Sequence, residues 1–214
     1  VLTIGMQLTE AMIVHGLATS SEARTRAVHM LDRVGIPNPK QLMGQYPHEL
    51  SGGMRQRVMI AMMMLLEPDI LIADEPTTAL DVTVQAQILD LLRDIVQDTS
   101  IGLILITHDM GVVAEMAEDV MVMKAGSVVE AGSVHQIFRA PSDAYTRALL
   151  EAVPSVETAS EILTSTESQA LLSAKHLSKS FSGSRTFGIA ASVTKAIDDV
   201  SLDILPGETL ALVG

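Results

Sequence analysis

Two adjacent carboxylates stand where a predicted buried strand ends. The apolar run Ile70–Ala73 leads directly into Asp74 and Glu75, and Pro76 follows. One carboxylate at such a place can hold Mg²⁺ through its bound waters, and the other can accept a proton from an attacking water. On its own, an Asp-Glu-Pro sequence is more simply a solvated strand end before a turn.

A histidine follows the next predicted strand in the same way. The apolar segment 101–106 ends in Thr107, His108 and Asp109. The carboxyl ends of parallel strands share one edge of a sheet, and ligands of such sheets sit at that edge. His108 is therefore expected beside the carboxylates, where it could hydrogen-bond a phosphate in transfer. A lone histidine at a strand end is otherwise more often structural than catalytic.

Ser51, Gly52 and Gly53 begin a predicted helix. A helix N-terminus presents unpaired N–H groups and a partial positive charge. The two glycines would let phosphate oxygens approach the backbone closely, and the serine hydroxyl could donate a further hydrogen bond. The simpler alternative is a serine that caps the helix after a glycine-rich turn, and Asp81 has the same alternative role at the next helix.

The pattern around these residues predicts an α/β fold. Segments 69–73 and 101–106 are almost entirely apolar and are separated by a helical pattern over 83–96, which is typical of a parallel sheet covered on both faces. The sequence Thr19–Glu22 resembles a capping box that opens a helix to about residue 34. Further helices are expected over 4–16, 51–66, 133–139 and 143–152, and further strands near 120–123 and 127–130.

The composition excludes several classes of function. The 214 residues contain 14 Lys and Arg against 26 Asp and Glu, a net charge of −12, and only 2% aromatic residues, so we expect no nucleic acid as a partner. Without cysteine, the chain can form no disulfide, thiolate metal site or iron–sulfur cluster, and it has no cysteine nucleophile. No apolar run approaches the roughly 20 residues of a membrane-spanning helix.

A change in composition divides the chain. Residues 155–170 are rich in Ser, Thr and Glu, which indicates a linker between residues 1–154 and residues 171–214. The last part predicts strands over 170–181, 194–204 and 209–213, which are too few to bury a core of their own. We expect it to be the beginning of another domain, and the whole chain to be an internal fragment of a longer protein.

Taken together, the order and spacing of these motifs resemble the ATP-binding-cassette (ABC) ATPases. Leu50–Arg57, with Ser51, Gly52, Gly53 and Gln56, is similar to the family's signature motif. Ile70–Glu75 resembles its Walker B strand, Thr78–Asp81 its D-loop, and His108 its switch-loop histidine. The resemblance implies a partial P-loop NTPase-like α/β domain over 1–154, with a parallel core sheet and a helical signature subdomain, followed by the opening strands of a second ABC domain over 171–214.

The resemblance also implies roles for single residues. ATP and Mg²⁺ would be bound between two such domains, which lie in one chain or in a dimer. Asp74 would support Mg²⁺ through water, while Glu75 and His108 would be catalytic. The signature residues would contact the γ-phosphate of ATP held by the other domain, and Asp81 would couple the two sites. In the second domain Phe181 would stack on adenine, with a core phenylalanine as the alternative, and Gly214 would begin a Walker A loop.

Other segments resemble the dipeptide, oligopeptide and nickel importers, in their tandem, glutathione-type form. The segments are Tyr46–Glu49, Asp81–Gln87, Thr107–Val113 and Ala140–Leu150. The last departs from the pattern, because Asp143-Ala144 stands where the family usually has His-Pro. The resemblance implies ATP hydrolysis that energises peptide import, at the cytoplasmic face of the bacterial inner membrane. Partners would be the permease subunits and, indirectly, a periplasmic solute-binding protein.

Two alternatives to an active importer ATPase remain open. The chain contains no G-x-x-x-x-G-K-[ST] sequence to cradle phosphates, so the isolated chain is expected to be inactive and could be a non-catalytic fragment. The parent could also be a non-transport ABC ATPase that works on DNA. The net charge of −12 and the importer-like tail argue against that second alternative.

Overall fold

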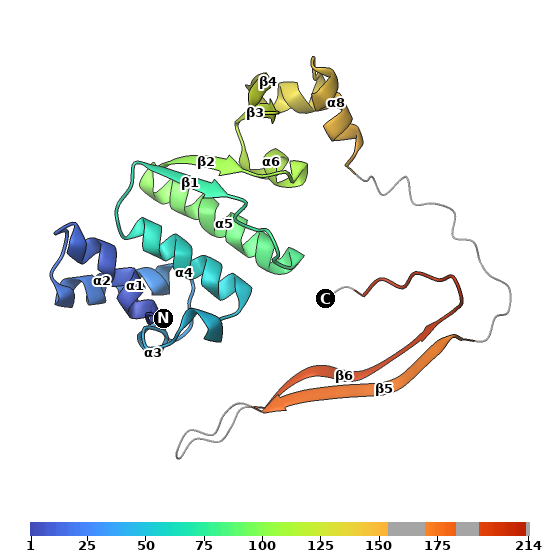
Figure 1. Ribbon diagram of the computed structural model, residues 1–214, viewed down its shortest axis with the longest axis horizontal. Coiled ribbons are helices and arrows are strands. Elements are labelled where there is room, and N and C mark those ends of the chain that lie inside the picture. The colour runs from blue at the N-terminus through green and yellow to red at the C-terminus, as the bar shows by residue number, and fades with distance from the viewer. Residues whose placement is uncertain (154–169, 183–192, 213–214) are drawn as a thin grey trace. The chain divides into compact units, whose positions relative to one another are not determined.

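A computed structural model describes residues 1–153, 170–182 and 193–212 of the chain (Figure 1). The chain divides into two compact units, Val1–Pro154 and Ser155–Gly214, and each is described by itself. Within the described residues, no helix combines the length and the apolar character needed to cross a bilayer.

The first part of unit one is helical. Its elements are α1 (Ile4–Val14), α2 (Ser20–Arg33), α3 (Pro39–Leu42), the short 3₁₀ helix η1 (Pro47–Glu49) and α4 (Gly52–Met64). The predicted capping box of α2 is confirmed, because the Thr19 N–H donates to the Glu22 carboxylate at 2.9 Å and the Thr19 hydroxyl accepts from the Glu22 N–H at 3.4 Å. Side chains such as Leu8, Met12 and Leu31 are fully buried where these helices meet.

A parallel pair of strands follows the helices. Strand β1 (Ile70–Asp74) pairs in parallel with β2 (Gly102–Ile106), and helix α5 (Val82–Thr99) connects them. This confirms the predicted strand–helix–strand order and the parallel pairing. Figure 1 shows α5 lying along the sheet, and its buried residues, including Ile88 and Leu92, join the same core as Leu71 of β1.

The expectation that both faces of this sheet are covered is wrong for the described residues. Side chains on a strand alternate between the two faces, and α5 covers only one of them. On the other face the side chains are 48–63% exposed, and they are Ile70, Ile72, Ile104 and Ile106.

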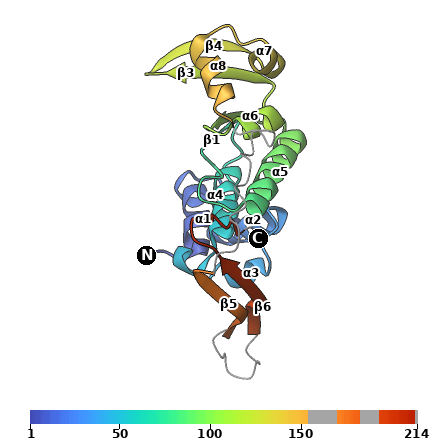
Figure 2. The same cartoon turned by 90° about the vertical axis from the view of Figure 1, so that its right-hand side faces the viewer.

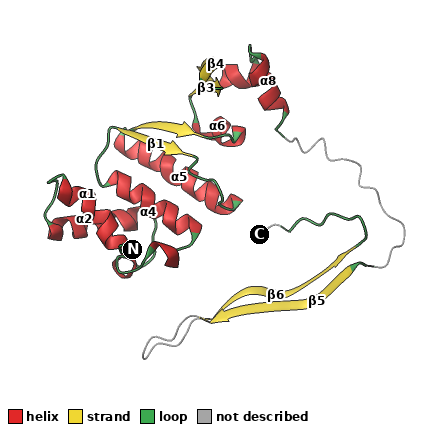
Figure 3. Cartoon of the chain, in the orientation of Figure 1, coloured by secondary structure: helices red, strands yellow, loops and turns green. Residues whose placement is uncertain are grey.

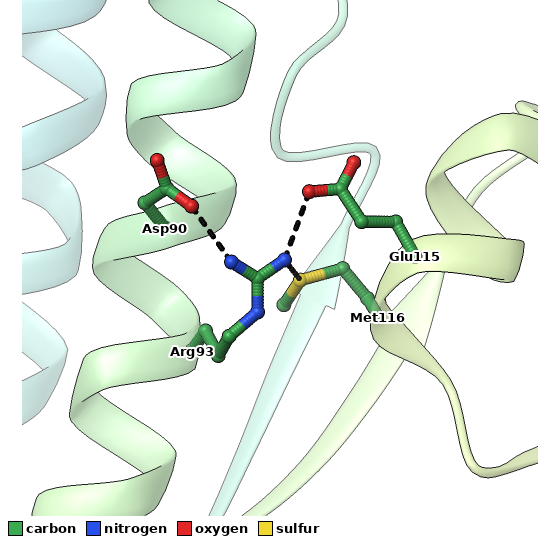
Figure 4. A network of polar contacts seen from close by, with 4 residues as sticks. All are labelled: Asp90, Arg93, Glu115 and Met116. Atoms are coloured by element: carbon green, nitrogen blue, oxygen red, sulfur yellow. Dashed lines mark hydrogen bonds and ion pairs between the residues drawn. The ribbon is translucent and has the colours of Figure 1, made fainter.

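The remainder of unit one forms a smaller group of elements. These are α6 (Met110–Met116), the antiparallel strands β3 (Asp119–Lys124) and β4 (Ser127–Ser133), α7 (Val134–Arg139) and α8 (Ala144–Glu151). Figure 2 shows β3, β4, α7 and α8 at one end of the unit and α3 at the other. Arg93 of α5 holds α6 in place, because its guanidinium donates to Asp90 at 2.7 Å and to Glu115 at 2.9 Å, beside the Met116 sulfur (Figure 4).

A buried carboxylate ties the segment before α8 to strand β4. Glu130 is only 7% exposed, and its oxygens accept from the Ser142 N–H at 2.7 Å, the Ser142 hydroxyl at 2.8 Å and the Asp143 N–H at 3.2 Å. The fully buried Thr146 hydroxyl, followed by these Ser142 and Asp143 donors, lowers the pKa of Glu130 to about 2.

The described part of unit two is an antiparallel hairpin. Strand β5 (Leu172–Ser182) pairs with β6 (Val193–Ile204), and the register shifts around His176 and Asp199, which both have positive φ. The strand predicted over 209–213 is wrong for residues 209–212, which are loop (Figure 3), and residue 213 lies outside the described residues. No third strand pairs with this hairpin among the described residues, so residues 209–212 have no ladder to join.

We predict that Glu130→Gln destabilises the protein in a pH-dependent manner. The lowered pKa means that the carboxylate contributes stability above about pH 4.5, and this contribution is lost as the pH falls towards about 2. The variant should therefore have a lower free energy of unfolding than the wild type at neutral pH, with a difference that shrinks in acid. Urea unfolding across this range measures the difference. Glu151→Gln, at an exposed position, is the control, and a difference that stays constant with pH would contradict the prediction.

Candidate functional site

The carboxyl end of β1 positions the two acidic residues. Asp74 is the last residue of β1 and is paired with Ile106 of β2. The Glu75 N–H extends the ladder by one further bond, to the Ile106 carbonyl at 2.8 Å. Glu75 then leaves the strand with φ of +45°, a left-handed conformation that is uncommon for a residue with a side chain. The ladder bond on one side and the turn on the other hold Glu75 in this conformation.

Both oxygens of the Glu75 carboxylate have a hydrogen-bond partner. His108 Nδ1 lies 2.8 Å from Oε1, and the Thr78 hydroxyl donates to Oε2 at 2.9 Å. An ionised carboxylate can only accept, so Nδ1 carries the proton and Nε2 is the free nitrogen of the ring. The hydrogen bond from His108, and then the one from Thr78, lowers the pKa of Glu75. The structure thus brings Asp74, Glu75 and His108 to one edge of the sheet.

The glycine-rich turn begins α4 in the way the simpler alternative describes. Ser51 is the N-cap of α4, and its hydroxyl accepts from the Met54 N–H at 3.3 Å. Asp81 likewise caps α5, with Oδ1 accepting from the Val84 N–H at 2.8 Å. Both side chains therefore have a structural role, and their proposed roles toward a phosphate or a second site remain predictions. Among the described residues, no hydrogen bond joins the Ser51 turn to Glu75.

The two glycines of this turn pack directly against the segment that follows Glu75. A methyl group added at Gly52 would lie 3.2 Å from Leu80, and one added at Gly53 would lie 2.5 Å from Val84 Cγ1. Cβ atoms do not approach other carbon atoms as closely as 2.5 Å, so the close approach of α4 and α5 requires glycine at position 53. The glycine-rich turn therefore packs directly against Leu80 and the first turn of α5.

Arg57 is a residue whose role the sequence analysis missed. Its guanidinium donates to the Val34 carbonyl at 2.6 Å and to the Gln87 side chain at 3.1 Å, so it joins α4 to the end of α2 and to α5. Its neighbour Gln56 is half-buried on α4. The signal for Arg57 is a charged residue on the partly buried side of a helix whose following residues, 58–64, are all apolar. Such a residue needs polar partners from the elements packed against it.

Two of the predicted site residues, Phe181 and Gly214, belong to unit two, which is described by itself. Phe181 lies on β5 with 59% of its surface exposed and with Lys179 Nζ 5.3 Å from its ring centre, so it is not a core residue. Its stacking on adenine remains a prediction. Gly214 lies outside the described residues.

Comparisons with known proteins identify the family of the chain. The family model described as "ABC transporter" matches residues 2–78. The glutathione import ATP-binding protein of Escherichia coli O1:K1 is 46% identical over 240 aligned residues, which include all of this chain and 38% of that protein. The chain belongs to the ABC transporter ATPase family. The same-named protein of Salmonella choleraesuis is 45% identical over 238 residues, again with 38% of its length covered.

Solved structures of ABC proteins resemble the chain as well. The cbiO1 protein of Clostridium perfringens, part of an ABC transporter complex, is 32% identical with a TM-score of 0.56, and the match covers 64% of this chain and 53% of that one. The MJ0796 cassette in its dimeric, post-hydrolysis state is 29% identical with a TM-score of 0.55, over 63% of this chain and 57% of that one. The family resemblance inferred from the motifs is therefore confirmed. ATP is the nucleotide that this ABC family binds.

The chain spans about two fifths of the length of the curated ABC relatives it matches.

We predict that Gly53→Ala disturbs the glycine-rich turn at the start of α4. Alanine normally stabilises a helix relative to glycine, by about 1 kcal/mol. Here the overlap with Val84 reverses the sign, and overpacking of this kind costs about 1–3 kcal/mol. Thermal or urea unfolding of the variant measures the loss.

Two further variants test the cause of that loss. Gly44→Ala is the control, since its added methyl group meets only the Gln41 carbonyl, at 3.6 Å. The double variant Gly53→Ala, Val84→Ala should recover most of the lost stability, because it removes the atom that clashes. A Gly53→Ala protein as stable as the wild type would show that α4 and α5 are not held this closely.

Proposed function

We propose that this chain is part of the ATP-hydrolysing subunit of an importer for glutathione or other peptides. The observation that carries the proposal is the Glu75 carboxylate at the end of β1, joined to His108 at 2.8 Å from the neighbouring strand. The names of the relatives, which are glutathione import proteins, support the class of solute. The importer-like segments around residues 46–49 and 140–150 support it independently of those names.

In this proposal Glu75 polarises the water that attacks the γ-phosphate of ATP. An ionised carboxylate at the open edge of a sheet can accept a hydrogen bond from that water and orient it. His108 contributes the free Nε2 side of its ring, which faces away from Glu75 and can contact the phosphate or the water. The side chain of His108 is 77% exposed, so a substrate has access to it.

Asp74 is the residue of this chain that would support Mg²⁺, through a bound water. Its carboxylate is exposed at the strand end and makes no side-chain hydrogen bond to another described residue, which fits this role. In the described part of the chain, no group of three or more His, Asp or Glu side chains is arranged so that it could hold a metal ion by itself, so phosphate and water oxygens would complete the coordination. The ion offsets the negative charge of the phosphates when it is bound.

The signature residues Ser51, Gly52, Gly53 and Gln56 are proposed to act on a second ATP. That ATP would be held by another nucleotide-binding domain, and the dimeric state of the MJ0796 cassette supports such an arrangement. Asp81 would couple the two sites, and Phe181 and Gly214 would belong to the second nucleotide site. We propose that residues 1–154 and 171–214 belong to two ABC domains, joined by the linker over 155–170.

The assembly is proposed to sit at the cytoplasmic face of the bacterial inner membrane. This chain would reach the membrane through permease subunits, and it would depend indirectly on a periplasmic solute-binding protein. The relatives are named as import proteins, which supports both the permease subunits and the solute-binding protein as partners.

We predict that Glu75→Gln in the full-length protein nearly abolishes ATP turnover and leaves ATP binding intact. Glutamine keeps the size of the side chain but cannot accept a proton, so the loss falls on hydrolysis alone. Phosphate release measures turnover, and equilibrium titration with radiolabelled ATP measures binding. Glu118→Gln, at an exposed position before β3, is the control. Undiminished turnover in Glu75→Gln would refute the assignment.

A further inference from the structure

A tight turn after β1 is closed by the side chain of Thr78 as well as by the backbone. The Thr78 N–H donates to the Glu75 carbonyl at 3.2 Å, and the Thr78 hydroxyl donates to Glu75 Oε2 at 2.9 Å. Pro76 follows Glu75 and fixes the φ angle at the second position of the turn. One residue therefore holds both ends of Glu75, its carbonyl and its carboxylate.

Among the described residues, the Thr78 hydroxyl makes no hydrogen bond other than the one to Glu75. Thr78 is exposed and makes no contribution to the buried core. The preceding residue, Thr77, is the buried threonine of this turn, and its carbonyl accepts from the Leu80 N–H at 3.2 Å. Thr77 is therefore the threonine that packs in this turn, whereas the hydroxyl of Thr78 hydrogen-bonds the Glu75 carboxylate.

The Glu75 carboxylate needs a partner of this kind. Its side chain is 43% exposed and has three rotatable bonds, so packing does not fix the plane of the carboxylate. His108 restrains Oε1, but its own ring is 77% exposed, and among the described residues it has no second hydrogen bond to hold it. Thr78, in contrast, is anchored in the same turn as Glu75, so its distance to the carboxylate is set locally.

We propose that Thr78 is a positioning residue for Glu75: its hydroxyl fixes Oε2 so that the carboxylate keeps one orientation toward the attacking water. The proposal rests on the function proposed above for Glu75. Each carboxylate oxygen has two lone pairs, so the bond from Thr78 leaves one on Oε2 for the water.

The test compares three substitutions at position 78 in the full-length protein. Thr78→Ala and Thr78→Val remove the hydroxyl, and valine keeps the branched shape, whereas Thr78→Ser keeps the hydroxyl. We expect Ala and Val each to lower kcat by about tenfold, the equivalent of one hydrogen bond to a charged group, with KM for ATP unchanged. Serine should restore kcat to near the wild-type value. Thr25→Ala, on α2, is the matched control, because it also loses a hydroxyl hydrogen bond at an exposed position, 3.1 Å from the Ser21 carbonyl.

The result that would overturn the proposal is equally direct. A kcat for Thr78→Ala equal to or above that of the wild type would show that the hydroxyl does not position the base. A serine variant as slow as alanine, or a loss that appears in KM rather than in kcat, would assign Thr78 a structural role instead. Melting temperatures of Ala, Val and Ser variants separate misfolding from loss of the hydroxyl.

Combining Thr78→Ala with Glu75→Gln distinguishes a failure of this proposal from a failure of the function proposed for Glu75. In single-turnover assays, Thr78→Ala should cause no further loss when Glu75 is already Gln, because Thr78 acts through that residue. Normal turnover in Glu75→Gln would refute the function of Glu75 and this proposal with it. If Glu75→Gln is inactive while Thr78→Ala turns over normally, the function of Glu75 stands and only the role of Thr78 fails.

Discussion

The parallel ladder between β1 and β2 is the constraint on which the site depends. It pairs Asp74 with Ile106 and adds one more bond, from the Glu75 N–H to the Ile106 carbonyl. A shift of one residue in this register would turn every side chain of β1 to the opposite face of the sheet. Because the register is held by Leu71 in the core beneath, the burial of an apolar side chain sets where Glu75 and His108 meet. The chemistry of the edge thus depends on packing several residues away from it.

Much of this arrangement could be predicted from sequence, since the signals are local. Apolar runs that end in polar residues predict strand ends, and the Thr19–Glu22 pattern predicts the start of α2. The contact between Glu75 and Thr78 is also local, three residues apart across a proline turn, but threonine hydroxyls at turns have several possible partners. Its choice of the carboxylate depends on the positive φ of Glu75, which no residue type in that segment signals.

Other features could not be predicted because they depend on what lies beside an element. Residues 209–212 have the apolar pattern of a strand, yet a strand requires a neighbour, and the described hairpin supplies none. The exposed face of β1 and β2 could not be predicted for the same reason. The apolar run that contains Ile70 and Ile72 is typical of a strand with both faces covered, but no described element packs on this face. Arg57 joins three helices, and its partners Val34 and Gln87 lie 23 and 30 residues away. A sequence pattern shows the local spacing and composition of residues, whereas these features depend on contacts between residues that are far apart in the sequence.

The exposed isoleucines on one face of β1 and β2 also affect the solubility of this part of the protein. Four branched apolar side chains lie on this sheet, and among the described residues no further strand pairs with its edges, so the sheet is a template for self-association. The net charge of −12 opposes this through mutual repulsion, which added salt screens. Solubility of these residues by themselves should therefore fall as ionic strength rises, so dilute samples in low-salt buffer above the isoelectric point are the practical choice for handling them.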